Sequence, residues 1–294
     1  MNLNQLQKVK DGRGFIAALD QSGGSSPKAL AGYGVPEDAY STSDEMFDLI
    51  HDMRTRIITS PGFGGDRILG AILFADTMRR RIEGVSTARY LWREKGVVPF
   101  LKVDEGLDEE RYGVQLMKPM TALDDLLEEG RENAIFGTKM RSVIKMADRD
   151  GIEANVEQQF EVGERILEAG MIPILEPEVD INCPEKAEAE HLLLGAILSR
   201  LSRLGDSGVM LKLTLPSQDD LYLGLIEHPN VIRVAALSGG YDHVEACERL
   251  ARQRGMVASF SRALLEGLAV DQSPEEFDAV LDRLVGNVFG ASAT

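Results

Sequence analysis

The stretch VMLKLT, residues 209–214, has the composition of a buried β-strand but carries a lysine, Lys212, near its centre. Lysine is among the residues least often fully buried, and an unpaired ammonium in a protein interior is energetically costly. Seven other short apolar runs share this pattern, with charged or polar residues toward one end. They span residues 15–20, 67–74, 97–104, 135–141, 171–178, 231–238 and 256–262.

Segments with helical periodicity separate these runs. Residues 43–58 place apolar side chains at positions 46, 49, 50, 53 and 57, which is the spacing of one helix face. We expect a second helix to begin at Ser217, and a third to be capped by Ser273 with Pro274 in its first turn. Short apolar runs that alternate with helices indicate a parallel sheet covered on both faces.

The number of these runs favours one closed fold. Eight strand–helix repeats fit the 294 residues of the chain, because a (β/α)₈ barrel usually needs about 250 residues. The expected fold class is therefore α/β, with a single TIM-barrel domain over residues 1–294 and an N-terminal helix before the first strand. An open, doubly wound sheet is the alternative.

The composition argues against several kinds of partner. The formal net charge is −16, the opposite sign from that needed to bind nucleic acid or an anionic membrane. Cys183 and Cys247 have no paired spacing, and the first residues lack the apolar region of a secretory signal. The four histidines show no metal-ligand spacing. We expect a cytoplasmic protein without a metal cofactor that binds neither nucleic acid nor membrane.

Charged residues lie near the end of most of the apolar runs. In a (β/α)₈ barrel the active site lies at the carboxyl ends of the strands, and residues two apart on a strand share a face. The runs supply four cations and several carboxylates to the expected mouth of the barrel. They are Asp20, Lys102, Asp104, Lys139, Arg141, Glu176, Glu178 and Lys212.

This set of groups suggests amine chemistry at a carbonyl. A lysine amine that is partly desolvated and close to other cations gives up its proton more easily, and the neutral amine attacks carbonyl carbons. The protonated imine that results withdraws electrons from the neighbouring carbon. Carboxylates beside it move the protons that dehydration and C–C cleavage require. We interpret Lys212 as the nucleophile, with Asp20, Glu176 and Glu178 as candidate proton-transfer groups.

Two glycine-rich segments predict sites for anionic groups. LSGGY, residues 237–241, and SFSR, residues 259–262, follow the seventh and eighth runs, where barrels commonly bind phosphate. DQSGGSSPK, residues 20–28, follows the first run. Backbone N–H groups and an arginine would hold a dianion at the first site. Two anion sites at one mouth suggest a sugar that is phosphorylated at both ends.

The sequence resembles the class I, Schiff-base-forming fructose-bisphosphate aldolases, nearest to their shorter bacterial form. The resemblance extends over roughly residues 5–290, with the motifs in the order of the family. These motifs are GFIAALDQSGGS, LKVDEG, GTKMRS, PILEPEV, MLKLTLP, LSGGY and SFSRAL. The resemblance implies a barrel that reversibly cleaves fructose 1,6-bisphosphate to dihydroxyacetone phosphate and glyceraldehyde 3-phosphate, in glycolysis or gluconeogenesis.

The resemblance also implies a role for each residue of the expected site. Lys212 would form the imine, Glu176 would shuttle the proton for imine formation, and Asp20 would handle the hydroxyl proton. Lys139 and Glu178 would tune these groups. One phosphate would be held by Ser238, Gly239, Gly240, Ser259 and Arg262, and the other by Ser22, Ser25, Lys28, Lys102 and Arg141. The resemblance implies no cofactor beyond the imine on Lys212. Members of the family commonly form homo-oligomers, but the sequence does not define the oligomeric state of this chain.

The chain departs from the animal members at several places. It has Gln21, Ala29 and Met140 where the animal enzymes have glutamate, arginine and tryptophan, so the phosphate site near Lys28 is expected to be weaker. Its last residues, NVFGASAT, contain no tyrosine. We therefore expect another group or solvent to carry out the proton transfer that this tyrosine assists.

Two rival hypotheses remain open from the sequence. One is a related Schiff-base lyase that acts on another phosphosugar, such as tagatose bisphosphate. The other is a barrel that binds a sugar phosphate without turnover. Loss of turnover with retained binding in Lys212→Met would favour catalysis, because binding alone does not require a nucleophilic lysine.

Overall fold

The computed structural model describes residues 2–260 and 264–292. Its main sheet contains eight parallel strands that neighbour one another in the order of the sequence. These are β1 (Phe15–Leu19), β2 (Ile68–Leu73), β5 (Val98–Lys102), β8 (Gly137–Ile144), β9 (Ile172–Val179), β10 (Val209–Thr214), β11 (Val231–Leu237) and β12 (Val257–Ala258). Because β12 lies beside β1, the sheet is a nearly closed barrel. The prediction of a (β/α)₈ barrel is confirmed.

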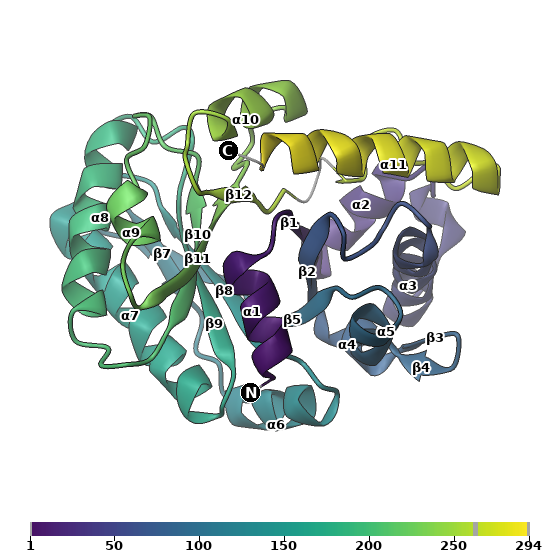
Figure 1. The fold of residues 1–294 in the computed structure, drawn as a ribbon, viewed down its shortest axis with the longest axis horizontal. Coiled ribbons are helices and arrows are strands. Elements are labelled where there is room, and N and C mark those ends of the chain that lie inside the picture. The colour runs from purple at the N-terminus through teal and green to yellow at the C-terminus, as the bar shows by residue number, and fades with distance from the viewer. Residues whose placement is uncertain (1, 261–263, 293–294) are drawn as a thin grey trace.

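Helices connect the strands and surround the sheet (Figure 1). They are α2 (Ser26–Gly32), α3 (Ser43–Thr59), α4 (Ala75–Arg79), α5 (Thr87–Arg93), α6 (Leu123–Glu132), α7 (Arg149–Glu168), α8 (Lys186–Leu201), α9 (Leu223–Ile226), α10 (His243–Leu250) and α11 (Pro274–Ala291). Two hairpins are added to this pattern. One pairs β3 (Arg81–Ile82) with β4 (Val85–Ser86), and the other pairs β6 (Leu107–Arg111) with β7 (Val114–Met117).

One of the two predicted helix caps agrees with the structure and the other does not. Thr42 and Glu45 form a capping box at the start of α3, and Ser273 caps α11 as expected. The helix predicted to begin at Ser217 is wrong, because only α9 forms in this segment. The Ser217 N–H donates to the buried Glu190 carboxylate at 2.9 Å, and Asp220 has a left-handed φ of 58°. The left-handed backbone at Asp220 interrupts a helix that would start at Ser217.

The N-terminal helix α1 (Leu3–Asp11) lies over the amino-terminal end of the barrel, in front of the strands in Figure 1. Its residue Val9 is fully buried among side chains of the barrel interior, including Leu69 and Val98. Arg233 from β11 donates to the carbonyl oxygens of Val9 at 2.9 Å and Gly12 at 3.0 Å. This end of the barrel is therefore covered, and the opposite end remains available for a site.

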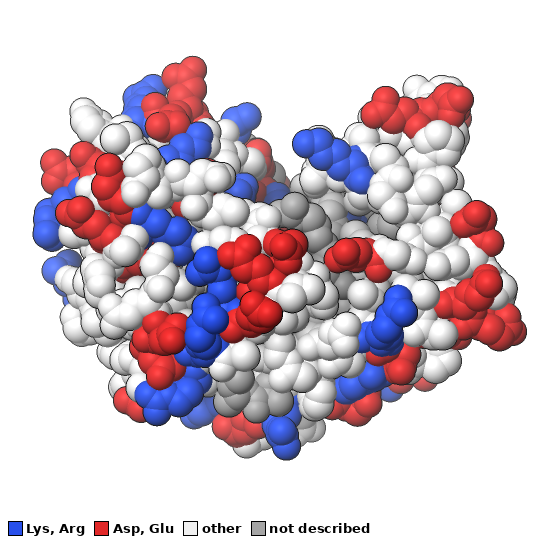
Figure 2. Space-filling view, turned by 90° about the horizontal axis from the view of Figure 1, so that it is seen from above, with Lys and Arg blue, Asp and Glu red and all other residues white. Residues whose placement is uncertain are grey.

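The surface carries many charged side chains of both signs. Figure 2 shows acidic and basic side chains interspersed over the face seen from above. Among the described residues, no helix is long and apolar enough to cross a membrane.

Candidate active site

The interior of the barrel changes from apolar to ionic along β9 and β10. On β10, Met210 belongs to the buried interior cluster, and Lys212 follows two residues later on the same face. On β9, Ile174 is in the same cluster and Glu176 follows it in the same way. The lysine in VMLKLT therefore belongs to a layer of charged side chains above the apolar floor of the barrel.

This ionic layer lines a cavity of about 450 Å³ at the carboxyl ends of the strands. The lining contains most of the residues predicted from the sequence: Asp20, Ser22, Ser25, Lys102, Lys139, Arg141, Glu176, Glu178, Lys212, Ser238, Gly239 and Ser259. Lys28 and Gly240 were predicted too, but they are not in the lining. Arg262 falls outside the described residues.

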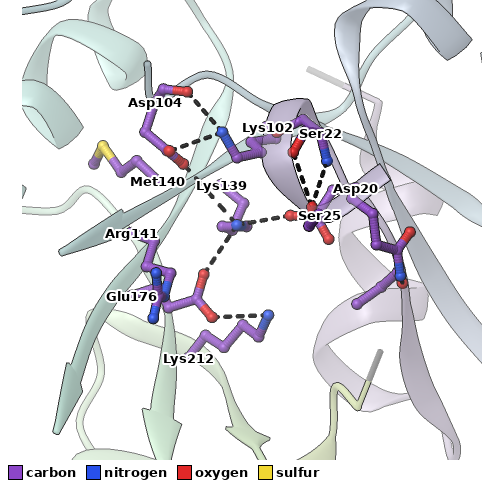
Figure 3. A network of polar contacts seen from close by, with 12 residues as sticks. Asp20, Ser22, Ser25, Lys102, Asp104, Lys139, Met140, Arg141, Glu176 and Lys212 are labelled. Atoms are coloured by element: carbon purple, nitrogen blue, oxygen red, sulfur yellow. Dashed lines mark hydrogen bonds and ion pairs between the residues drawn. The ribbon is translucent and has the colours of Figure 1, made fainter. Parts of the chain in front are cut away.

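Lys139 lies at the centre of a chain of ion pairs (Figure 3). Its Nζ is 2.7 Å from Asp20 Oδ2 and 3.1 Å from Glu176 Oε2. The other oxygen of Glu176, Oε1, is 2.9 Å from Lys212 Nζ. Four strands, β1, β8, β9 and β10, thus bring these groups together. Lys139 contacts both carboxylates, and one of them, Glu176, also contacts the Lys212 amine.

The electrostatics of this chain follow from burial and pairing. Burial opposes ionisation of Asp20, but Lys139 and Lys212 outweigh it and hold the pKa of Asp20 below its ordinary value. The pKa of Glu176 is lowered in the same way, with burial again opposing and Lys139 and Lys212 prevailing. Burial disfavours the Lys139 ammonium, but Asp20 and Glu176 raise its pKa. Lys139 is therefore a permanent cation, and both carboxyl groups are ionised at neutral pH.

Lys212 is buried, with 5% of its surface exposed. The sequence suggested an amine crowded by cations, and the structure adds a carboxylate directly against it. Glu176 lies between Lys212 and Lys139, so the nearest charged neighbour of the amine is a proton acceptor. A hydrogen bond of 2.9 Å gives the proton of Lys212 a short route to Glu176.

Two other cations of the cavity have carboxylate partners of their own. Lys102 Nζ lies 2.8 Å from Asp104 Oδ1, and it also donates to the Asp104 carbonyl oxygen at 2.7 Å. Arg141 donates to Glu178, and this pair raises the pKa of Arg141 against the effect of burial. Both cations still line the cavity, where an anionic group of a ligand can approach them.

The predicted phosphate loops lie on two sides of the cavity. After β11, Gly239 and Gly240 have φ values of 62° and 135°, which favour glycine. A Cβ atom at Gly239 would also come within 2.8 Å of the Ile181 side chain. After β1, the Ser25 hydroxyl accepts from the Ser22 N–H and donates to the Ser22 carbonyl oxygen. Each loop thus brings hydroxyl or backbone donors to the cavity.

The sequence places Asp104 near the mouth of the barrel but gives it no role in the reaction. Its Oδ2 is buried 4.0 Å from Lys139 Nζ, and it has no hydrogen-bond partner among the described residues. The spacing of Asp104 from Lys102 was the signal that could have found it. Gln21, Gly106 and Leu107, which also line the cavity, carried no such signal.

The fold and this cavity define a class: a (β/α)₈ barrel with a buried lysine–carboxylate site at the carboxyl ends of its strands. Among the described residues, no three or more His, Cys, Asp or Glu side chains are arranged to hold a metal ion.

Comparison with known proteins identifies the family within that class. The family model described as fructose-bisphosphate aldolase class-I matches residues 3–217. A fructose-bisphosphate aldolase class 1 of Synechocystis is 58% identical over 294 residues, which is 100% of this chain and 98% of that protein. One of Porphyromonas gingivalis is 55% identical over 292 residues, 99% of each. The chain belongs to the class I fructose-bisphosphate aldolase family, whose members use a lysine Schiff base without a metal.

A solved structure supports the fold independently. A fructose-bisphosphate aldolase from Plasmodium falciparum matches with a TM-score of 0.78, covering 98% of this chain and 93% of that one. Their sequences are only 18% identical, so this likeness concerns the barrel alone. The family resemblance read from the motifs is confirmed.

Proposed function

We propose that this chain reversibly cleaves fructose 1,6-bisphosphate into dihydroxyacetone phosphate and glyceraldehyde 3-phosphate through an imine on Lys212. The observation that carries the proposal is the buried chain of contacts Lys212–Glu176–Lys139–Asp20, with Nζ···O distances between 2.7 and 3.1 Å. Family membership and two relatives named fructose-bisphosphate aldolase class 1 support the choice of substrate.

Imine formation begins with the pair Lys212 and Glu176. Transfer of a proton from the Lys212 ammonium to Glu176 leaves a neutral amine and a carboxylic acid. The amine attacks the ketose carbonyl carbon, C2, and forms a carbinolamine. Glu176 then returns its proton to the carbinolamine hydroxyl, which leaves as water, and the protonated imine remains.

C–C cleavage uses the carboxylate on the other side of Lys139. Asp20 is ionised, so it can accept the proton of the C4 hydroxyl as the C3–C4 bond breaks. The electrons of that bond move to C3 and the imine, which becomes an enamine, and the aldehyde product leaves. Protonation at C3 and hydrolysis of the imine release dihydroxyacetone phosphate and restore the lysine.

Lys139 serves both steps as a fixed charge. It contacts Asp20 and Glu176 at once, and its raised pKa keeps it protonated while each carboxyl group changes state. Without the Lys139 charge between them, the negative charges of Asp20 and Glu176 would repel each other and disfavour ionisation of both groups. Glu178 has a separate partner, Arg141, and would orient this arginine at the edge of the cavity.

The two phosphate groups would occupy the loops on the two sides of the cavity. Ser238, Gly239 and Ser259 line one side, with Gly240 and Arg262 assigned to the same site from the sequence. Ser22, Ser25, Lys102 and Arg141 line the other, with Lys28 assigned from the sequence. Local cations and backbone donors would then attract a dianionic substrate to an acidic protein.

A cleavage assay in the presence of EDTA tests this function. We expect wild-type protein to cleave fructose 1,6-bisphosphate and Lys212→Met to lose cleavage at least about 10³-fold, because no other group forms the imine. Lys95→Met is the matched control, since Lys95 is also partly buried but donates to the carbonyl oxygens of Thr59 and Ser60, away from the cavity. Full activity in Lys212→Met would overturn the mechanism. If the wild-type protein cleaved tagatose bisphosphate but not fructose 1,6-bisphosphate, the proposed substrate would be wrong.

We further propose that the enzyme works in the cytoplasm; the family resemblance allows a homo-oligomer. Its two cysteines, Cys183 and Cys247, are unpaired, which suits a reducing compartment. Light scattering coupled to size exclusion would measure the assembly, and a mass of one chain would contradict the oligomer. Recovery of the protein in a cell fraction other than the cytosol would contradict the location.

A further inference from the structure

Arg54, in the middle of α3, is fully buried against the loops that follow β1 and β2. Its Nη1 donates to Thr77 Oγ1 at 2.5 Å. Its Nη2 donates to the Gln21 carbonyl oxygen at 2.6 Å and lies 3.3 Å from Gln21 Oε1. A single side chain from the outer helix layer therefore holds the backbone and the side chain of the residue directly after Asp20.

A buried cation at this place is costly for the fold. Among the residues that the structure describes, no carboxylate lies within ion-pairing distance of Arg54, and its Nε has no hydrogen-bond partner. Burial lowers the pKa of Arg54 to about 10, while Asp20 and Asp76 act in the opposite direction from farther away. The group is thus still charged at neutral pH. Because an apolar side chain would pack here without that desolvation cost, packing alone does not account for an arginine.

Two of the three Arg54 hydrogen bonds go to Gln21, the residue next to the candidate base. The Asp20 carboxylate is held by Lys139 at 2.7 Å, and the carbonyl oxygen of Gln21 is held by Arg54 at 2.6 Å. Gln21 is fixed a second time, since its Nε2 donates to the Ala18 carbonyl oxygen at 3.3 Å. Asp20 is therefore restrained through its side chain from inside the barrel, and the next residue, Gln21, is restrained through its backbone from outside.

We propose that Arg54 is a positioning residue that fixes Asp20 for proton transfer during C–C cleavage, acting through Gln21 rather than on the substrate. Arg54 is not in the lining of the cavity. The inference rests on the proposed function, specifically on the role of Asp20 as the group that accepts the hydroxyl proton. Asp20 acts after the imine has formed, so loss of Arg54 should impair cleavage but leave imine formation intact.

Two measurements on the same variants separate these steps. One is kcat for cleavage of fructose 1,6-bisphosphate, and the other is the rate at which borohydride traps dihydroxyacetone phosphate on Lys212. For Arg54→Met we expect kcat to fall about 10²-fold, the size expected when a catalytic group is misplaced by about 1 Å. The trapping rate should stay within about threefold of wild type, because Lys212 and Glu176 lie on β10 and β9. Arg54→Lys, which keeps a cation and one donor, should recover part of kcat.

Arg56→Met is the matched control on the same helix. Arg56 donates to the Tyr33 hydroxyl and to the carbonyl oxygens of Ala269 and Val270, away from Asp20. Its loss removes five side-chain hydrogen bonds of α3, two more than the loss of Arg54, so it reports the effect of general loosening. We expect Arg56→Met to lower the midpoint of unfolding and to leave the ratio of cleavage to trapping unchanged.

Asp20→Asn, alone and combined with Arg54→Met, tests the coupling between the two residues. If Arg54 acts through Asp20, the double variant should be no slower in cleavage than Asp20→Asn alone. Wild-type kcat in Arg54→Met would overturn the inference, as would cleavage and trapping that fall in parallel, or additive losses in the double variant. If the proposed function itself fails, wild type shows no trapped adduct, or Asp20→Asn cleaves at the normal rate. These outcomes differ from failure of the Arg54 inference.

Discussion

Lys139 shows how a single side chain organises the site. Its ammonium is buried between Asp20 and Glu176, and neither carboxylate could remain ionised there as easily without it. In the folded protein the pKa values of these two groups are lowered, so their ionisation stabilises the fold. This contribution is fully present at a pH above the pKa values of the unfolded chain, about 3.9 for Asp20 and 4.3 for Glu176. This contribution is lost as the pH falls through the still lower values of the folded protein.

The variant Lys139→Met should therefore be destabilised by about 3–5 kcal/mol at neutral pH, because it leaves two buried carboxylates without a cation between them. The pKa of Asp20 and of Glu176 should rise, so the folded variant takes up protons at higher pH than the wild type. The difference in the free energy of unfolding should then shrink as the pH is lowered from about 7 to about 5. Urea titrations across this range measure it.

Lys145→Met is the control for that experiment, since Lys145 follows the same strand, β8, but pairs with Glu110 at the surface. We expect a loss of less than about 1 kcal/mol there. A difference between Lys139→Met and wild type that stays constant with pH would contradict the role of Lys139 as the counterion.

At the scale of the elements, the glycines after β11 set the shape of one proposed phosphate loop. In Gly239→Ala the new residue must adopt a left-handed φ of 62°, and its Cβ would meet the side chain of Ile181. We expect the loop to shift and KM for fructose 1,6-bisphosphate to rise about tenfold, with a smaller change in kcat. Steady-state kinetics test this. Gly195→Ala in α8, where a Cβ meets no atom within 4 Å, should leave KM unchanged, and an equal effect at both positions would count against the loop.

The strands of the barrel could be predicted from the sequence more completely than its helices and its buried contacts. Each of the eight apolar runs contains all or most of a barrel strand, because a strand buried on both faces must be continuously apolar until it reaches the mouth. The eighth run, 256–262, holds only the short strand Val257–Ala258. The same rule located Lys212 and Glu176, but it could not show that Glu176 separates the two lysines. The helix predicted at Ser217 failed because Asp220 adopts a left-handed φ of 58°, and contacts with the distant Gln253 and Arg254 hold it there. Arg54 gave no signal, since an arginine in an amphipathic helix normally faces solvent.

At the scale of the molecule, the barrel separates stability from chemistry. An apolar interior cluster and α1 occupy the amino-terminal end, while the ionic layer and its loops occupy the carboxyl end. We propose that residues 1–294 form one domain, because strands from both halves of the chain share this interior cluster. Calorimetry should then show one unfolding transition, and two well-separated transitions would contradict a single domain.

The claim that joins all three scales is that Lys212 forms an imine with the substrate. The most direct test adds dihydroxyacetone phosphate and borohydride in EDTA, followed by intact-mass analysis and peptide mapping. We expect one reduced adduct per chain, located on Lys212 and absent from Lys212→Met. An unmodified Lys212 in protein that still cleaves fructose 1,6-bisphosphate, or an adduct on another lysine, would contradict it.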